Sequence, residues 1–227
     1  MQLVFIHGAM NDHTVWTAQS RYFAERGHQV LAIDLPAHCD DGAAPLSSVA
    51  AMADWLLARL DAADIKQAAL IGHSMGSLIA LEAAARAPQR ITHLAILGSS
   101  YPMKVADALL DTARNDEAKA IDMVTKWSHS RGYANTEPLR QLMLRLAGKQ
   151  LLHTDLAACN AYDNGAAAAT QVRCPALFIY GANDVMTPPA PPFITNAQSI
   201  TLASGHALMT EQADAVNEAL ANFIGSR

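Results

Sequence analysis

Ser74 is the residue of this 227-residue chain whose surroundings best suit nucleophilic chemistry. It is the centre of Gly72-His73-Ser74-Met75-Gly76, which follows the apolar run Ala68–Ile71 and precedes a helical pattern. A serine at a sharp turn from strand to helix has a strained backbone. Small residues are needed two before and two after it, because a Cβ there would collide with the turn. The turn exposes Oγ and aims the first N–H groups of the helix at the same point. The pattern therefore predicts Ser74 as a nucleophile.

A serine hydroxyl needs a base to take its proton and an acid to orient that base. In the chain order serine, acid, histidine, two later segments fit. Asp184 follows the apolar run Ala176–Tyr180 and a glycine turn, and His206 follows the run Ser199–Leu202. Both residues would lie at the carboxyl edge of a parallel sheet, where Ser74 also lies. We predict that His206 is the base and that Asp184 orients it.

Other histidines and acids fit these roles less well. His73 is adjacent to Ser74 but points elsewhere on the turn, and His7 is expected to anchor a loop. Asp34 is the main rival acid because it also ends a strand. It precedes Ser74, however, and Asp34-Leu35-Pro36 indicates a loop that ties down the sheet; Asp163 fits less well still. Five further histidines lie in elements without a matching acid, in loops or in the helical middle of the chain: His28, His38, His93, His129 and His153.

The segment His7-Gly8-Ala9 directly follows the first apolar run. Gly8 lets the backbone approach a substrate closely, and a tetrahedral intermediate needs two N–H donors for its oxyanion. We predict that Ala9 and Met75 supply these donors. The alternative is that His7-Gly8-Ala9 is an ordinary turn at the end of a strand.

Short apolar runs alternate with helical patterns, which is typical of βαβ units and a mostly parallel sheet. We therefore predict an α/β fold whose sheet has about six strands and is flanked by helices. The predicted strands are Leu3–Ile6, Gln29–Ile33, Ala68–Ile71, His93–Leu97, Ala176–Tyr180 and Ser199–Leu202. The predicted helices of the flanks are Thr14–Arg26, Ser47–Leu60, Met75–Ala87 and Glu211–Ile224.

The segment 101–170 interrupts this alternation. It has no convincing strand, and Leu139, Leu142, Met143 and Leu146 share one helical face. We predict a helical cap of residues 101–170, inserted after the fourth strand between the core segments 1–100 and 171–227. The alternative is that these helices only cover one side of the sheet. A cap would provide apolar pocket walls, with these predicted substrate-binding residues: Met123, Trp127, Met143 and Leu146.

Composition narrows the class of protein. A net charge of −5 without a basic run argues against a nucleic-acid partner. Cys39, Cys159 and Cys174 are too few for a disulfide framework or a zinc cage, so we expect reduced thiols, no metal and a cytoplasmic protein. Polar residues interrupt the longest apolar stretch, and no basic residue precedes Met1–Ile6, so neither a membrane span nor a signal peptide is expected.

These motifs resemble those of the α/β-hydrolase superfamily over nearly the whole chain. The matching segments are His7-Gly8, Asp34-Leu35-Pro36-Ala37-His38, the Ser74 pentapeptide, Gly181-Ala182-Asn183-Asp184 and Gly205-His206. The chain is most similar to small bacterial carboxylesterase-like members with a helical cap. It departs from them in two ways. The first strand starts almost at Met1, without the usual N-terminal hairpin, and Ala37 and Cys39 stand where the family often has glycines.

The resemblance implies hydrolysis through an acyl-enzyme, without a cofactor. We therefore expect a serine esterase that cleaves small or medium uncharged carboxylic esters with a Ser-His-Asp triad. The alternative is a lyase or carbon–carbon bond hydrolase that uses the same triad on a carboxylated metabolite. Basic or polar cap residues facing Ser74 would favour it. A third hypothesis, a non-catalytic binding module, is disfavoured by the intact triad.

Overall fold

A single parallel sheet organises the computed structural model, which describes residues 1–39 and 42–225. Within these residues the strand order is β2-β1-β3-β4-β5-β6, and all neighbouring strands are parallel. The strands are β1 (Gln2–Ile6), β2 (Gln29–Ala32), β3 (Ala68–His73), β4 (Ile91–Leu97), β5 (Ala176–Gly181) and β6 (Gln198–Leu202). The predicted α/β class, with a six-stranded parallel sheet, is therefore confirmed.

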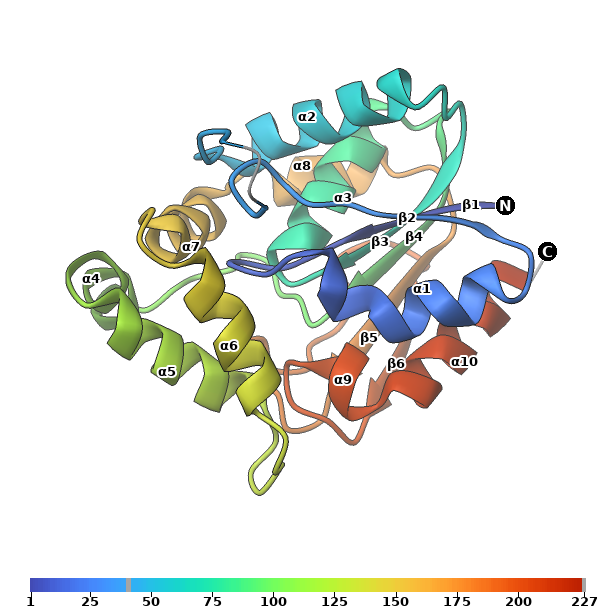
Figure 1. The fold of residues 1–227 in the computed structure, drawn as a ribbon. Helices are drawn as coiled ribbons and strands as arrows, with labels where there is room; N and C mark the ends of the chain where they lie inside the picture. Colours follow the sequence, from blue (N-terminus) through green and yellow to red (C-terminus); the bar gives the residue numbers. More distant parts are fainter. Residues whose placement is uncertain (40–41, 226–227) are drawn as a thin grey trace.

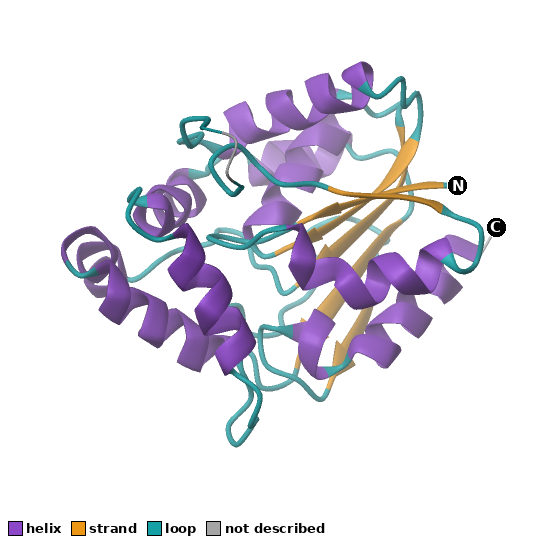
Figure 2. Ribbon diagram, in the orientation of Figure 1, coloured by secondary structure: helices purple, strands orange, loops and turns teal. Residues whose placement is uncertain are grey.

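Helices cover both faces of the sheet (Figure 1). One face carries α2 (Val49–Ala62), α3 (Met75–Arg86) and α8 (Gly165–Gln171). The other face carries α1 (Thr17–Ala24), α9 (Leu208–Glu211) and α10 (Ala213–Gly225). Figure 2 shows the strands enclosed between these two helical layers.

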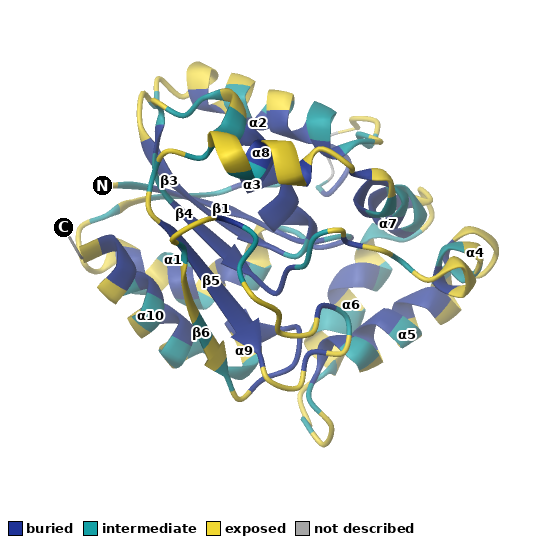
Figure 3. Ribbon diagram, turned by 180° about the vertical axis from the view of Figure 1, so that it is seen from behind, coloured by how far each residue is buried: buried dark blue, intermediate teal, exposed yellow. Residues whose placement is uncertain are grey.

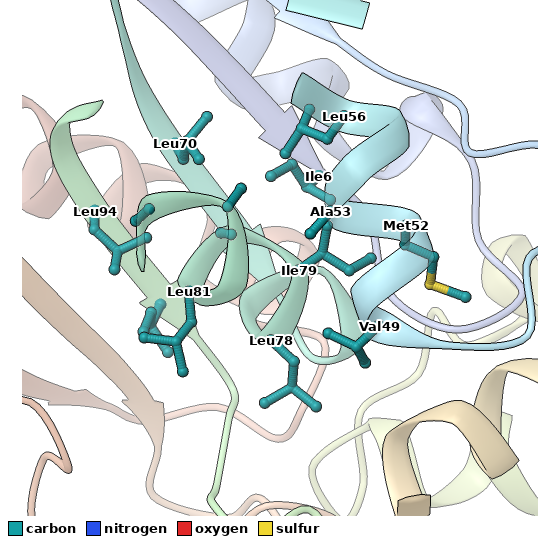
Figure 4. Packing of buried hydrophobic residues seen from close by; sticks show 14 of the residues in the cluster. Ile6, Val49, Met52, Ala53, Leu56, Leu70, Leu78, Ile79, Leu81 and Leu94 are labelled. Atoms are coloured by element: carbon teal, nitrogen blue, oxygen red, sulfur yellow. The ribbon is translucent and has the colours of Figure 1, made fainter. Parts of the chain in front are cut away.

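The buried side chains explain this layering, because successive residues of a strand point to opposite faces. Leu70 of β3 belongs to the cluster under α2 and α3, whereas its neighbour Ile71 belongs to the cluster under α1 and α10. Figure 4 shows Leu70 with Leu56 and Ile79 in the first cluster. In Figure 3 strands β3 and β5 are buried along their whole length, whereas β6 at the edge of the sheet is partly exposed. Strands that are apolar on both faces are expected of such a covered sheet.

Two predicted helices are divided in the structure. Instead of one helix over Thr14–Arg26, a 3₁₀ turn, η1 (His13–Trp16), leads into α1. The Asp12 carboxylate caps that turn by accepting the Thr14 N–H at 2.9 Å. Instead of one helix over Glu211–Ile224, α9 ends at Glu211 and α10 begins at Ala213. Gln212 separates them because its φ of −133° and ψ of 45° lie outside the helical region.

Helices also fill the chain between β4 and β5, as predicted for a cap inserted after the fourth strand. In Figure 1, α4, α5, α6 and α7 lie beyond one end of the sheet, whereas α8 packs beside α3. The four outer helices are α4 (Asp107–Asn115), α5 (Glu117–Ser128), α6 (Glu137–Leu146) and α7 (Leu151–Ala161), and they share a buried apolar cluster. The division into 1–100 with 171–227 and a cap of 101–170 stays a prediction.

No helix in residues 1–39 and 42–225 is long and apolar enough to cross a membrane. Within the same residues, no group of three or more His, Cys, Asp and Glu side chains is arranged to hold a metal ion.

Candidate active site

A cavity of about 830 Å³ lies between the cap and the carboxyl ends of the strands. The loops that follow β1, β3, β5 and β6 form one side of it, and α4, α5, α6 and α7 contribute to the other. Ala9, Ser74 and His206 are among the residues that line the cavity. The predicted site thus lies where open parallel sheets commonly bind ligands, beyond the carboxyl ends of their strands.

Ser74 has the strained backbone that its position predicts. Its φ of +53° and ψ of −120° place a non-glycine residue in a region that L-amino acids rarely adopt. A Cβ on Gly72 would lie 2.2 Å from the Gly76 carbonyl oxygen, and one on Gly76 would lie 2.3 Å from that of Ile6. No non-bonded pair of heavy atoms tolerates such distances. Glycine is therefore required at both positions, because α3 begins in direct backbone contact with the end of β1.

His206 and Asp184 are joined by a hydrogen bond of 2.8 Å between Nδ1 and Oδ2, although they come from different loops. Both side chains are almost completely buried. Because Nδ1 donates its proton to the carboxylate, Nε2 of the neutral imidazole carries the lone pair. Nε2 is then the nitrogen that can accept a proton.

The Asp184 carboxylate accepts several further hydrogen bonds. Its Oδ1 accepts the backbone N–H groups of Met186 and Thr187, each at 2.8 Å, and its Oδ2 accepts the Thr187 hydroxyl at 2.8 Å. Burial alone would raise the pKa of Asp184, but the electrostatic interaction and hydrogen bond with His206, together with the Thr187 bonds, lower it. The carboxylate therefore stays ionised and holds His206 in one orientation. Thr187 is not among the predicted site residues, although a threonine three residues after an acid in a turn is a recognisable signal.

The loop after β1 packs directly against Ser74. A Cβ on Gly8 would lie 3.2 Å from the Ser74 Cβ, which is closer than ordinary side chains approach. Ala9 follows Gly8 on the cavity wall, and Met75 is the first residue of α3. The N–H of a first helical residue has no partner within its own helix. The two predicted oxyanion donors therefore belong to the two segments that flank Ser74.

His73 and His7 have structural hydrogen bonds. His73 donates from Nε2 to the backbone carbonyl of His206 at 2.8 Å, so it supports the loop that carries the predicted base. His7 accepts the Leu35 N–H at Nε2, at 3.1 Å, which ties the loop after β1 to the loop after β2. Burial, followed by the nearby His206, lowers the pKa of His73 to about 3, and burial followed by His38 lowers that of His7 well below 6.5. Both rings are therefore neutral at ordinary pH.

The rival residues lie elsewhere or have other partners. Asp34 accepts the His13 N–H at 2.7 Å and lies 2.9 Å from its ring Nδ1, on the partly exposed side of η1. Asp163 borders a separate, smaller cavity near α2. His129 lines the main cavity, but its Nδ1 donates to the Thr125 carbonyl at 2.8 Å and not to a carboxylate.

The predicted pocket wall is partly corrected. Trp127 and Met143 line the cavity, whereas Met123 and Leu146 do not. The last two are half-buried and pack against the apolar cluster within the cap. On α5 the residues that line the cavity are Val124, Trp127 and Ser128, which centre on the direction of Val124. Met123, one residue before Val124, points about 100° away from that direction. The other apolar cap residues of the wall include Leu109, Leu139, Leu142, Leu152 and Leu156.

A profile of the family described as "alpha/beta hydrolase fold" matches residues 2–121, which is more than half of the chain. The chain belongs to the α/β-hydrolase family. The resemblance inferred from the motifs is thereby confirmed. The positive φ of Ala37, +71°, shows how this α/β hydrolase keeps a left-handed turn without a glycine at that position.

Curated relatives cover most of this α/β hydrolase. A pimeloyl-[acyl-carrier protein] methyl ester esterase from Chromobacterium violaceum is 28% identical, over 82% of this chain and 77% of its own. The (E)-2-((N-methylformamido)methylene)succinate hydrolase of Acinetobacter baylyi is 26% identical, over 80% of this chain and 72% of its own length. A dihydrolipoyllysine-residue acetyltransferase component from Pseudomonas putida is 26% identical over 98% of this chain, which spans only 63% of that relative's length.

Solved structures agree with the fold. The enol-lactonase from Burkholderia xenovorans has a TM-score of 0.87, at 23% identity, and covers 99% of this chain and 91% of its own. A thermophilic esterase has a TM-score of 0.84, at 24% identity, with coverage of 98% and 88%. At these identities the likeness concerns the fold.

Because His73 is neutral when folded, its lowered pKa predicts loss of stability in acid. Below about pH 6.5 the unfolded chain binds a proton at this residue that the folded chain does not, until the pH reaches the folded pKa of about 3. The free energy of unfolding should therefore decrease as the pH is lowered through this window. In His73→Gln the unfolded chain takes up about one proton fewer. The slope of the unfolding free energy against pH should therefore be smaller by roughly 1.4 kcal/mol per pH unit. Urea unfolding between about pH 4 and pH 6 measures both slopes. Parallel curves for the two proteins would contradict the lowered pKa.

Proposed function

We propose that this chain is a serine esterase in which Ser74, His206 and Asp184 act as a catalytic triad. The observation that carries the proposal is the Asp184–His206 hydrogen bond of 2.8 Å, on the same cavity as the strained Ser74 turn. A buried acid that fixes Nδ1 leaves Nε2 to act as a base, and a strained turn presents a serine hydroxyl. The esterase and hydrolase names of the relatives support the same reading.

The proposed reaction has two halves. His206 Nε2 takes the hydroxyl proton as Ser74 Oγ attacks the ester carbonyl carbon, and the N–H groups of Ala9 and Met75 hold the resulting oxyanion. The bond to the alcohol oxygen then breaks, His206 protonates that oxygen, and the acyl group stays on Ser74. A water molecule, deprotonated by His206, attacks the acyl-enzyme and releases the carboxylic acid. Asp184 keeps the ring oriented and stabilises its positive charge in both halves.

The size and walls of the cavity suit an acyl chain of medium length. About 830 Å³ is within the usual range for sites that enclose small organic ligands. Trp127 and Met143 give the cap side an apolar surface, as do the leucines of α6 and α7. Burying each additional methylene of a substrate against such a surface contributes about 0.8 kcal/mol. We therefore expect the rate to rise with chain length until the cavity is filled.

Removal of the Ser74 hydroxyl tests the proposal. We expect Ser74→Ala to lower kcat on p-nitrophenyl esters by about 10⁴-fold or more, because the proposed acyl-enzyme forms on the Ser74 hydroxyl. Esters from acetate to decanoate, assayed by p-nitrophenolate release, would give the chain-length profile. Ser47→Ala, an exposed serine outside the cavity, is the matched control and should keep wild-type rates. Turnover that persists in Ser74→Ala, or no turnover of any ester by the wild type, would rule out the esterase assignment.

A second candidate is favoured by the charges on the cavity wall. Among the described residues, the lining includes Lys104 and Arg145 but no aspartate or glutamate, although the chain is acidic overall. Two cations without a carboxylate would suit a substrate that carries a carboxylate of its own. This observation supports the same triad acting on a carboxylated metabolite, as a lyase or carbon–carbon bond hydrolase. Arg145 lies 3.7 Å from the Asp12 carboxylate, so a substrate would compete with that ion pair.

A pair of matched esters tests whether the cavity recognises a substrate carboxylate, as the second candidate requires. If Arg145 binds a carboxylate, the wild type should prefer mono-p-nitrophenyl succinate to p-nitrophenyl butyrate. Arg145→Gln should then lower the ratio of the two kcat/KM values about three- to tenfold, because one charged hydrogen bond is lost. Arg140→Gln is the matched control, since Arg140 is on the same helix but pairs with Asp122, away from the cavity. An unchanged ratio in Arg145→Gln would leave the neutral ester as the substrate class.

A further inference from the structure

Asp155 of the cap is a fully buried carboxylate that reaches into the core. It lies on α7, and its Oδ2 accepts the backbone N–H of Met10 at 2.7 Å. The same oxygen lies 2.9 Å from Nε2 of His38, which is also buried. Met10 follows the predicted oxyanion donor Ala9, and His38 lies in the loop after β2. One carboxylate from the cap therefore binds both loops beside the proposed oxyanion site.

The hydrogen bonds define the charge of this pair. Nδ1 of His38 lies 3.0 Å from the Pro36 carbonyl oxygen, which can only accept, so Nδ1 carries a proton. A second proton lies between Nε2 and Asp155, which makes the contact formally an imidazolium–carboxylate pair. Burial alone would lower the pKa of His38, but the hydrogen bond and the charge of Asp155 outweigh it, and the pKa is raised.

Other titratable groups face this pair from the neighbouring elements. The His7 ring lies 4.6 Å from the His38 ring, and burial keeps it neutral. Cys159, one turn after Asp155 on α7, has a pKa that is raised by burial and then by the Asp155 charge, so it stays a neutral thiol. Neither neighbour contributes a charge that would replace Asp155 as the partner of His38.

The backbone around the pair adopts conformations that need external support. Met10 has a φ of +48° and Ala37 a φ of +71°, and both residues are completely buried. Non-glycine residues rarely adopt this left-handed region unless other contacts hold them there. The Asp155 bond to the Met10 N–H is such a contact, because it is charged, short and shielded from water.

We propose that Asp155 is a positioning residue of the hydrolytic reaction: from the cap, it fixes the loop of Gly8 to Asn11 so that the Ala9 N–H points at the oxyanion. Asp155 does not line the cavity, but Leu152, Leu156 and Cys159 of the same helix do. The helix that provides part of the substrate wall thus also holds an oxyanion donor in place. This inference rests on the proposed esterase function.

Three substitutions separate the elements of the proposal. Asp155→Leu removes both hydrogen bonds of Oδ2. Asp155→Asn keeps an oxygen acceptor for the Met10 N–H but loses the charge, and it places an amide at the position of Oδ1, which has no partner among the described residues. His38→Gln keeps a side-chain N–H donor toward Asp155. Asp111→Asn, an exposed carboxylate on α4, is the matched control.

The test compares kcat and KM on the best p-nitrophenyl ester with the affinity for a trifluoromethyl ketone of the same chain length. Ser74 Oγ adds to the carbonyl carbon of that ketone to form a hemiketal, whose negatively charged oxygen occupies the oxyanion site. We expect Asp155→Leu to lower kcat about 10- to 100-fold with KM changed less than about threefold, and to weaken ketone binding by a similar factor. The losses of kcat and of ketone affinity should be smaller in Asp155→Asn and smaller again in His38→Gln. Asp111→Asn should lose neither.

The outcomes distinguish this inference from the proposed function. Thermal unfolding shows which variants are folded. If Asp155→Leu does not fold, Asp155→Asn and His38→Gln test the positioning role instead. A folded variant with unchanged kcat and ketone affinity would overturn the positioning role while the esterase stands. A loss confined to KM, or a fall in kcat with unchanged ketone affinity, would do the same. Absence of Ser74-dependent turnover in the wild type would instead overturn the proposed function and the inference with it.

Discussion

The backbone contact between the start of α3 and the end of β1 sets the geometry of the whole site. Gly76 lies so close to the carbonyl oxygens of Ile6 and His7 that a Cβ there would be 2.3 and 2.5 Å from them. This approach holds Ser74 at a positive φ and brings it against Gly8. The nucleophile turn and the loop after β1 therefore form one close-packed unit. The cost of the strained Ser74 conformation is offset by the packing of α3, which is almost completely buried.

The loop of His206 is held from several directions. Asp184 accepts a hydrogen bond from the His206 ring, and His73 donates one to the His206 carbonyl. From the cap, the Ser128 carbonyl accepts the Ala207 N–H at 2.7 Å. Glu211 accepts the Gly205 N–H at 3.1 Å and, with its other oxygen, the Ser130 N–H at 2.7 Å. The cap thus supports the loop of the proposed base as well as the loop of the proposed oxyanion donor, and it does more than cover the cavity.

Local sequence signals were enough to predict the sheet and the placement of Ser74, Asp184 and His206. Each of these residues ends a strand or follows one, and parallel strands bring their carboxyl ends to one edge whatever the rest of the chain does. The packing within the cap was not predictable in this way. An apolar helical face identifies α6 but not how much of its length reaches the cavity: Leu139, Leu142 and Met143 line it, whereas Leu146, the last residue of α6, does not. The contact of Asp155 with His38 joins residues 117 positions apart, and no local pattern indicates it.

Covalent labelling can show whether Ser74 is the nucleophile. A fluorophosphonate reacts with a serine that a neighbouring base activates, and digestion followed by mass spectrometry identifies the modified residue. We expect one adduct, on the peptide that contains Ser74. We expect no adduct in Ser74→Ala and much slower labelling in His206→Ala. A folded wild-type protein that remains unlabelled, or that carries its adduct on another residue, would show that Ser74 is not the nucleophile.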